Sequence, residues 1–514
     1  MKASLAIRVA TVVLAGFAVA VFGGAGMADA QPRAALGAAL PPPIAQAFRR
    51  AEVPLSAVAL YVREVGAPAP RVSHRAGVPM NPASTMKILT TSMALDLLGR
   101  DFTWKTDVLA AGPIIDGVLA APLILRGSGD PKFTWEHLRD LVSRLRAAGL
   151  ATIAGDILVD RSHFGPIRDT AETFDGQTLK PYNVAPDALL FNFKSVGFRF
   201  TPESDGSVTV TTDGPPPDGL TIVNQLRAGP GPCGDWRQRI ESRFDNGPNA
   251  ARAIFAGTYP SECGEREWYV SLFDHNGLIA GTFARLWREA GGQWSGILRD
   301  GVAPREARLL AQHRSAPVLD AVGDINKFSN NVMTRQLMLT LDVEMNGPPA
   351  RLDRLTDNAR RWARSRMIDA ESIIIENGSG LSRIERLTAA GLAQILEYGL
   401  TAPWSTEFIA SLPVAGIDGT LSKRLAGGSA QGRAFLKTGT LTGVKALAGY
   451  LVRPDGRKLL FVCFVNHPNA EAAVPAMDAA VEYFMQPAAA PTTGTPAPEA
   501  EGKSPAQRNP QRLR

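Results

Sequence analysis

Cysteine and histidine are scarce in this sequence, and their arrangement argues against a metal centre. The 514 residues include three cysteines and six histidines. The histidines are His74, His137, His163, His275, His313 and His467. They are scattered, and no two have the His-x-x-x-His spacing that places two zinc ligands on one helix face. We expect ordinary surface or core histidines, no bound metal and no organic cofactor.

The sequence also lacks the signs of nucleotide and nucleic-acid binding. Gly127-Ser128-Gly129 is not followed by the glycine and lysine of a phosphate-binding loop. The formal net charge is +6, which suggests attraction to anionic surfaces such as the cell envelope. Several basic residues crowd the C-terminus: Lys503, Arg508, Arg512 and Arg514. Because this charge belongs to the tail, we infer no nucleic-acid partner.

Long hydrophobic runs are missing except at the N-terminus. Lys2 and Arg8 precede an apolar stretch over 9–21, and Ala28-Asp29-Ala30 follows it as a small-x-small cleavage site. This pattern predicts a signal peptide over 1–30, a mature chain without a membrane span, and a location in the periplasm or at the outer face of the cytoplasmic membrane. An uncleaved anchor is the alternative, but the run is shorter than the about 20 residues of a span.

Export gives the few cysteines a meaning, because an oxidising compartment permits disulfides. Cys233 and Cys263 lie in the same middle region, flanked by glycine and proline. We predict a disulfide between them, with two unpaired thiols as the alternative. Cys463 lies within the apolar run 459–465 and is expected to be a buried free thiol.

Three short motifs are present in a fixed order, and together they suggest acyl transfer. They are Ser84-Thr85-Met86-Lys87, Ser329-Asn330-Asn331 and Lys437-Thr438-Gly439. A serine hydroxyl needs a base to accept its proton and donors to hold the oxyanion that forms. Ser84 and Lys87 share one face of a helix, so the lysine amine can be that base if burial and a nearby cation, here Lys437, depress its pKa.

The expected fold is α/β, with an antiparallel sheet flanked by helices. The first motif falls on a helix that begins near Pro82, is apolar on all sides and is ended by Gly99, so we place Ser84 on the first turn of a buried helix. Expected strands are 57–63, 123–126, 156–160, 207–212, 435–441, 443–452 and 458–465. Expected helices are 135–148, 282–289, one from about 316, one carrying Ser329, and 470–485.

The distance between the first two motifs predicts an insertion. From Ser84 to Ser329 the chain runs 245 positions, which is too long for a loop. We divide the chain into a discontinuous catalytic domain, an inserted region with a nested subdomain, and a tail that lacks large apolar residues and should be disordered. The catalytic domain comprises 31–100 and 316–486. The inserted region is 101–315, with the nested subdomain at about 195–278, and the tail is 487–514.

The ordered motifs resemble those of penicillin-recognising serine acyltransferases. The long insertion resembles D-alanyl-D-alanine carboxypeptidases/endopeptidases, the low-molecular-mass class C penicillin-binding proteins of peptidase family S13. Two further segments are similar to that family: 377–382, and 411–416 with 418–421. The resemblance covers most of 55–485, and it implies a penicillin-binding/β-lactamase-like transpeptidase core.

The resemblance also implies a role for each motif residue. Ser84 would be the acylated nucleophile and Lys87 its general base. Ser329 would relay a proton to the leaving group, and Asn331 would hold the substrate amide. Lys437 would tune Lys87 and meet the substrate carboxylate. Thr438 and Gly439 would also bind substrate, with the threonine hydroxyl donating to that carboxylate, and the backbone N–H groups of Ser84 and Thr440 would form the oxyanion hole.

Two positions depart from the family pattern. Asn330 is the middle residue of the second motif, a position that tolerates variation. Asn377 stands where an aspartate is expected, which puts a local turn interaction in doubt.

The resemblance implies hydrolysis of peptidoglycan stem peptides through a Ser84 acyl-enzyme, with β-lactams as covalent inhibitors. A β-lactamase and a catalytically silent wall-binding scaffold are the alternatives.

Overall fold

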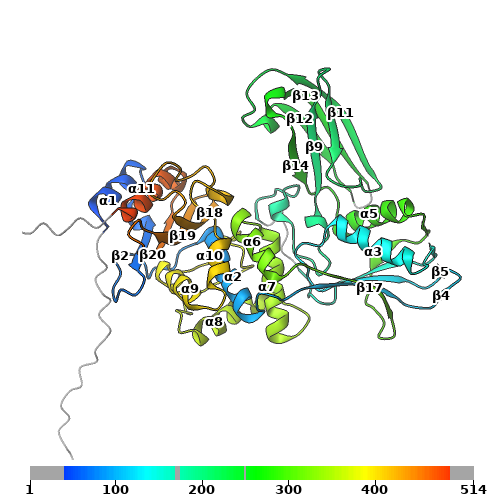
Figure 1. The fold of residues 1–514 in the computed structure, drawn as a ribbon, viewed down its shortest axis with the longest axis horizontal. Helices are drawn as coiled ribbons and strands as arrows, with labels where there is room; N and C mark the ends of the chain where they lie inside the picture. The colour runs from blue at the N-terminus through cyan, green and yellow to red at the C-terminus, as the bar shows by residue number, and fades with distance from the viewer. Residues whose placement is uncertain (1–39, 168–173, 248–249, 487–514) are drawn as a thin grey trace, which may run out of the picture. The chain divides into compact units, whose positions relative to one another are not determined.

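The computed structural model of the protein describes residues 40–167, 174–247 and 250–486, and Figure 1 shows their secondary structure. The predicted signal peptide, 1–30, and the predicted tail, 487–514, lie outside the described residues. Within the described ranges, the strands form five sheets. None of the helices there is long and apolar enough to span a membrane.

A five-stranded antiparallel sheet joins the two ends of the described chain. Its strand order is β18-β19-β20-β1-β2. The strands are β1 (Val58–Glu64), β2 (Val72–His74), β18 (Ala434–Leu441), β19 (Val444–Val452) and β20 (Lys458–Asn466). The predicted strands at 57–63, 435–441, 443–452 and 458–465 are therefore confirmed within one or two residues. The motif Lys437-Thr438-Gly439 lies on β18, the edge strand.

This central sheet is covered on both faces, which explains its almost wholly apolar strands. On β20, Val462 and Phe464 belong to one apolar core, whereas Phe461 and Cys463 belong to another on the opposite face. Successive strand residues point to opposite faces, so both sets must be hydrophobic. The expected buried free thiol of Cys463 is confirmed.

Helices cover both faces of this sheet. The core that contains Val462 also contains residues of α2, α6, α7, α8, α9 and α10, and the core that contains Cys463 also contains residues of α1 and α11. These helices are α1 (Pro42–Arg50), α2 (Met86–Leu97), α6 (Val318–Phe328), α7 (Asn331–Asn346), α8 (Leu355–Ser365), α9 (Ala389–Thr401), α10 (Ser405–Ser411) and α11 (Val474–Met485). Gly99, with φ +77°, follows the end of α2 as expected.

Two of the helix predictions were wrong at the motifs. Ser84 does not lie on the first turn of an α-helix, because a 3₁₀ turn over Ala83–Thr85 precedes α2. Ser329 does not lie within a helix: it terminates α6 in the left-handed region, and α7 begins only at Asn331. Ser84 and Ser329 thus both lie in short non-α segments next to helix ends.

The strands between the first two motifs form the other four sheets. Two have the orders β16-β8-β6-β3-β17 and β15-β7-β5-β4. Their strands are β3 (Lys105–Ala110), β4 (Ile114–Ile115), β5 (Val118–Leu119), β6 (Leu123–Gly127), β7 (Thr152–Ile153), β8 (Ile157–Asp160), β15 (Gln293–Trp294), β16 (Leu298–Asp300) and β17 (Arg308–Arg314). The helices there include α3 (Trp135–Ala147) and α5 (His275–Glu289). Helix α5 begins seven residues before the predicted start because Asp274 caps it, accepting from the backbone N–H of Gly277 at 2.6 Å.

The remaining two sheets are three-stranded and lie within 196–270. Their orders are β10-β9-β14 and β11-β13-β12. The strands are β9 (Val196–Pro202), β10 (Val208–Thr212), β11 (Leu220–Gly229), β12 (Ile240–Asp245), β13 (Ala251–Pro260) and β14 (Arg266–Val270). We retain the division into a catalytic domain, an inserted region and a nested subdomain as a proposal, which these sheet memberships support.

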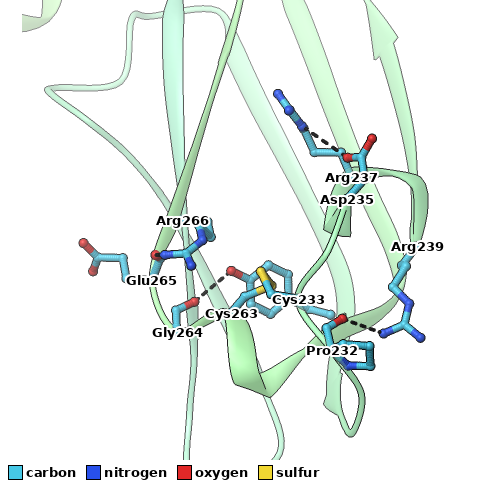
Figure 2. The surroundings of a disulfide bond; sticks show 10 residues. Pro232, Cys233, Asp235, Arg237, Arg239, Cys263, Gly264, Glu265 and Arg266 are labelled. Atoms are coloured by element: carbon cyan, nitrogen blue, oxygen red, sulfur yellow. Dashed lines mark hydrogen bonds and ion pairs between the residues drawn. A yellow bond between two sulfur atoms is a disulfide. The ribbon is translucent and has the colours of Figure 1, made fainter. Parts of the chain in front are cut away.

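A disulfide joins Cys233 and Cys263, as the sequence predicted. Figure 2 shows its surroundings, where Arg239 donates to the Pro232 carbonyl at 3.1 Å. The Tyr259 hydroxyl donates to the Gly264 carbonyl at 2.8 Å. The bridge therefore connects the loop after β11 to the 3₁₀ turn that follows β13.

Removing this disulfide should lower the thermal stability of the proposed nested subdomain and leave the residues of the three motifs unchanged. The two cysteines are 30 positions apart, and closing a loop of that length stabilises the fold by about 3–4 kcal/mol in the chain-entropy model. We expect the variant with Cys233→Ser and Cys263→Ser to melt at a lower temperature in a calorimetric scan, and the wild type to respond similarly to reductant. A Cys463→Ala control should keep that response to reductant; equal melting of oxidised and reduced wild type would contradict the prediction.

Candidate active site

The turn that carries Ser84 is held in a strained conformation. Ala83, which precedes it, has φ +43°, a region that a residue with a Cβ adopts at a cost of about 1–2 kcal/mol. The Asn81 side chain offsets this cost: its Oδ1 accepts from the Ala83 N–H at 2.9 Å and its Nδ2 donates to the Ser382 carbonyl at 2.8 Å. The fully buried Ala83 and the half-buried Ser84 therefore have a defined position next to the cleft.

Lys87 lies one turn further along the chain, and its amine has three neighbours. Nζ is 3.0 Å from Ser84 Oγ and 2.7 Å from Asn331 Oδ1, and it also donates to the Ser379 carbonyl. The side chain is completely buried. A neutral amine has two N–H donors and one lone pair. The two carbonyl oxygens accept from the donors, which leaves the lone pair for the Ser84 hydroxyl.

The surroundings of Lys87 favour this neutral form. Burial lowers the pKa of Lys87 well below its ordinary value, the positive charge of Lys437 lowers it further, and the Glu385 carboxylate acts in the opposite direction. The sequence predicted that Lys437 would lower the pKa of Lys87, and the structure agrees. A lowered pKa makes this amine a better acceptor for the Ser84 proton than an ordinary lysine, which is charged at neutral pH.

Ser329 and Lys437 form the opposite wall of the site. Ser329 has φ +59° at the end of α6, and its Oγ accepts from Lys437 Nζ at 2.8 Å. Lys437 also donates to the Thr438 carbonyl at 3.0 Å. Burial lowers the pKa of Lys437 to about 7. The second and third motifs are thus joined by a direct hydrogen bond across 108 positions of sequence.

A cavity of about 420 Å³ opens between the three motifs. It is lined by Ser84, Ser329, Asn331, Thr438 and Thr440, together with Phe174, Asp175, Tyr182, Leu381, Arg383, Thr420, Leu441 and Thr442. The structure therefore brings the predicted residues of all three motifs to one cleft. No group of His, Cys, Asp and Glu side chains with the arrangement of a metal site occurs in the described part of the chain.

Several residues of the cleft were not found from the sequence. The Tyr182 carbonyl accepts from Asn331 Nδ2 at 3.3 Å, and the Thr420 hydroxyl lies 2.8 Å from that of Thr438. Thr420 and Arg383 lie in or next to the two further segments that resemble the family, so those segments could have indicated them. Tyr182 belongs to the region between the first two motifs, where no local pattern marks it.

The close packing around Gly439 explains why this position has no side chain. A Cβ here would lie 2.9 Å from the Pro82 carbonyl oxygen and 3.0 Å from Ala83 Cβ. Gly439 therefore allows strand β18 to approach the turn that holds Ser84.

The two departures from the family pattern have structural explanations. Asn330 caps α7, because its Oδ1 accepts from the Met333 N–H at 3.1 Å. Asn377 retains the turn interaction that seemed in doubt: its Oδ1 accepts from the N–H of Ser379 at 3.0 Å and from its hydroxyl at 2.6 Å. A neutral amide thus makes these contacts.

Comparison with known proteins agrees with this geometry. A model of the D-Ala-D-Ala carboxypeptidase 3 (S13) family matches residues 43–486. The chain belongs to this family. It is accordingly a serine-type D-Ala-D-Ala carboxypeptidase of the S13 family, and the family resemblance seen in its motifs is confirmed.

Individual relatives have low sequence identity to this chain, but the similarity covers most of its length. The chain is 28% identical to a D-alanyl-D-alanine carboxypeptidase of Actinomadura sp. (strain R39), over 79% of this chain and 77% of the relative. It is 26% identical to the D-alanyl-D-alanine carboxypeptidase DacB of Haemophilus influenzae, over 75% and 80%.

Solved structures show the same fold. Penicillin binding protein 4 (dacB) of Haemophilus influenzae superposes with a TM-score of 0.70 at 22% identity, covering 86% of this chain and 99% of that one. The same protein complexed with a β-lactam gives a TM-score of 0.67 at 21% identity, with the same coverage. The S13 chain described here therefore has the penicillin-binding protein fold.

Proposed function

We propose that Ser84 is the acylated nucleophile of this carboxypeptidase and Lys87 its general base. The observation that carries the proposal is the arrangement at Lys87 Nζ, where two carbonyl oxygens accept its protons and the third neighbour is Ser84 Oγ. In the first step Ser84 Oγ attacks the carbonyl between two D-alanines, and its proton moves to the Lys87 amine.

The second and third motifs serve the leaving group and the substrate. Ser329, hydrogen-bonded to Lys437, relays a proton to the departing amine as the bond to D-alanine breaks, which leaves an ester on Ser84. Lys437 and Thr438 bind the terminal carboxylate. Asn331 uses its remaining N–H to hold the substrate amide.

The oxyanion is held by backbone donors, and water completes the cycle. The N–H groups of Ser84 and Thr440 are the proposed oxyanion hole, and both residues line the cleft. Water then attacks the ester and releases the shortened peptide. A β-lactam presents the same kind of carbonyl and would leave Ser84 acylated.

The natural substrate is the peptidoglycan stem peptide, and the working compartment lies outside the cytoplasmic membrane. The proposal of export rests on the predicted signal peptide over 1–30. We include DD-endopeptidase activity, in which the leaving amine belongs to a second stem peptide instead of free D-alanine.

A direct assay separates this function from its rivals. Purified protein should release D-alanine from a pentapeptide ending in D-Ala-D-Ala, and mass analysis of a muropeptide digest should reveal any opening of cross-linked dimers. After incubation with a β-lactam, the adduct should be found on the tryptic peptide that contains Ser84. Rapid β-lactam turnover without D-alanine release would indicate a β-lactamase, and the absence of both reactions would indicate a silent wall-binding scaffold.

A further inference from the structure

Glu385 is a fully buried carboxylate whose partners are backbone amides of one loop. Its Oε1 accepts from the N–H groups of Glu376, Asn377 and Gly378 at 3.2, 2.9 and 2.7 Å. Its Oε2 accepts from the Gly380 N–H at 2.9 Å. Charge-assisted bonds of this kind are about twice as strong as bonds between neutral groups. The loop over 376–380 is therefore organised around one negative charge.

The same loop faces the helix that carries the base. The carbonyl of Gly378 accepts from the Thr90 hydroxyl at 2.7 Å, and the carbonyl of Ser379 accepts from Lys87 Nζ. Lys87 and Thr90 are three residues apart on α2, so they lie on one helix face. The loop thus presents its carbonyl groups to α2 and its amide groups to Glu385.

A single peptide group connects the carboxylate to the base. The peptide unit between Ser379 and Gly380 accepts from Lys87 through its carbonyl and donates to Glu385 through its N–H. Gly380 has φ +78°, and a Cβ there would lie 2.0 Å from the Ala83 carbonyl oxygen. The loop can therefore shift little without displacing the turn that precedes the nucleophile.

Glu385 also sets part of the electrostatic environment of Lys87. Among the residues that the structure describes, the charged groups that act most on this lysine are Lys437 on β18, Arg335 on α7 and Glu385, of which Glu385 alone is negative. Burial raises the pKa of Glu385 above its ordinary value, and the four N–H donors limit that rise by stabilising the carboxylate. All four partners of the two carboxylate oxygens are N–H donors. A protonated Glu385 would have an O–H group with no acceptor among them, so this arrangement favours the charged form.

We propose that Glu385 is a positioning residue for the Lys87 base, acting through the Ser379–Gly380 peptide group and through its negative charge. This inference rests on the proposed role of Lys87. It also explains how the turn tolerates Asn377 in place of an aspartate, because the negative charge of the loop comes from position 385 instead.

The test replaces Glu385 with its neutral isostere. In Glu385→Gln, the amide N–H₂ meets backbone donors and the negative charge near Lys87 is lost. We expect the β-lactam acylation rate to fall between about tenfold and a hundredfold, as for a slightly misplaced catalytic group. The acidic limb of the pH–rate profile should move to lower pH, because an ammonium without a nearby anion loses its proton more readily.

Two matched variants provide the controls. Glu376→Gln removes a carboxylate from an exposed position on the same loop, and it should leave both the rate and the acidic limb at wild-type values. Glu385→Asp keeps the charge but shortens the side chain, so its rate should fall while the acidic limb stays in place. This variant also provides a test if Glu385→Gln does not fold.

The outcomes distinguish a role in the chemistry from a structural one. A slower Glu385→Gln enzyme with an unmoved acidic limb would overturn the proposal, and so would a wild-type profile in that variant. Full activity in Glu385→Asp would also overturn it, because the reach of the carboxylate would then not matter. If wild-type protein is not acylated at Ser84, the proposed function fails, and this result is separate from any effect at position 385.

Discussion

Replacing Ser84 with alanine should abolish both acylation by β-lactams and release of D-alanine. The change removes the only atom proposed to form the covalent intermediate, and the cavity, Lys87 and Lys437 remain in place. Loss of a nucleophile of this kind costs about 10⁴-fold or more in rate. Mass spectrometry of the intact protein after β-lactam treatment, and a D-alanine assay on the pentapeptide, measure the two activities.

A matched control is available on the same helix. Ser92 is buried on α2, and its hydroxyl has no hydrogen-bond partner in the described structure. We expect Ser92→Ala to retain activity. Because Ser84 is only half-buried, Ser84→Ala should melt at nearly the wild-type temperature. Residual labelling at another residue, with peptidase activity intact, would contradict the assignment of the nucleophile.

Replacing Lys87 with methionine should cause the second-largest loss. Methionine keeps most of the side-chain length and suits a buried site, but it cannot accept the Ser84 proton. It also leaves Asn331 Oδ1 and the Ser379 carbonyl without their donor. General-base catalysis contributes about 10²–10⁴-fold, so we expect acylation to slow by about 10³-fold. Stopped-flow measurement with a chromogenic β-lactam gives the rate.

The pH dependence of acylation provides a second check on Lys87. As the pH falls below the depressed pKa of Lys87, the amine becomes protonated and can no longer accept the Ser84 proton. The wild-type rate should therefore fall on the acidic side of the profile. Lys458→Met, on an exposed position of β20, should keep the wild-type profile. A wild-type rate in Lys87→Met would show that another group is the base.

Local patterns predicted most of the elements near the site. The strands of the last third were recognisable because each combines an apolar run with a turn, and Asp455-Gly456 joins two of them as a hairpin. The disulfide was also predictable, since Cys233 and Cys263 were the two cysteines in turn-rich surroundings. These features depend on residues close together in sequence or on residue type alone.

The backbone at the two serines could not be read in the same way. Helix periodicity predicted that Ser84 and Ser329 would lie on helices, but each lies in a short segment beside a helix end. Ala83 and Ser329 have positive φ values that local preference disfavours in residues with a Cβ. Such conformations persist because tertiary contacts hold them, among them the bond from the Asn81 side chain to the Ser382 carbonyl and the bond from the Lys437 amine to Ser329.

The three ordered motifs, with one serine hydroxyl and two lysines, were enough to indicate serine acyl transfer and the family to which the chain belongs. Which groups meet depends on the tertiary structure. Packing brings Asn331 and the Ser379 carbonyl, 244 and 292 positions away in sequence, to the Lys87 amine. The physical reason is that hydrogen bonds and burial act over a few ångströms, so contacts between residues hundreds of positions apart depend on how the helices, sheet and loops pack.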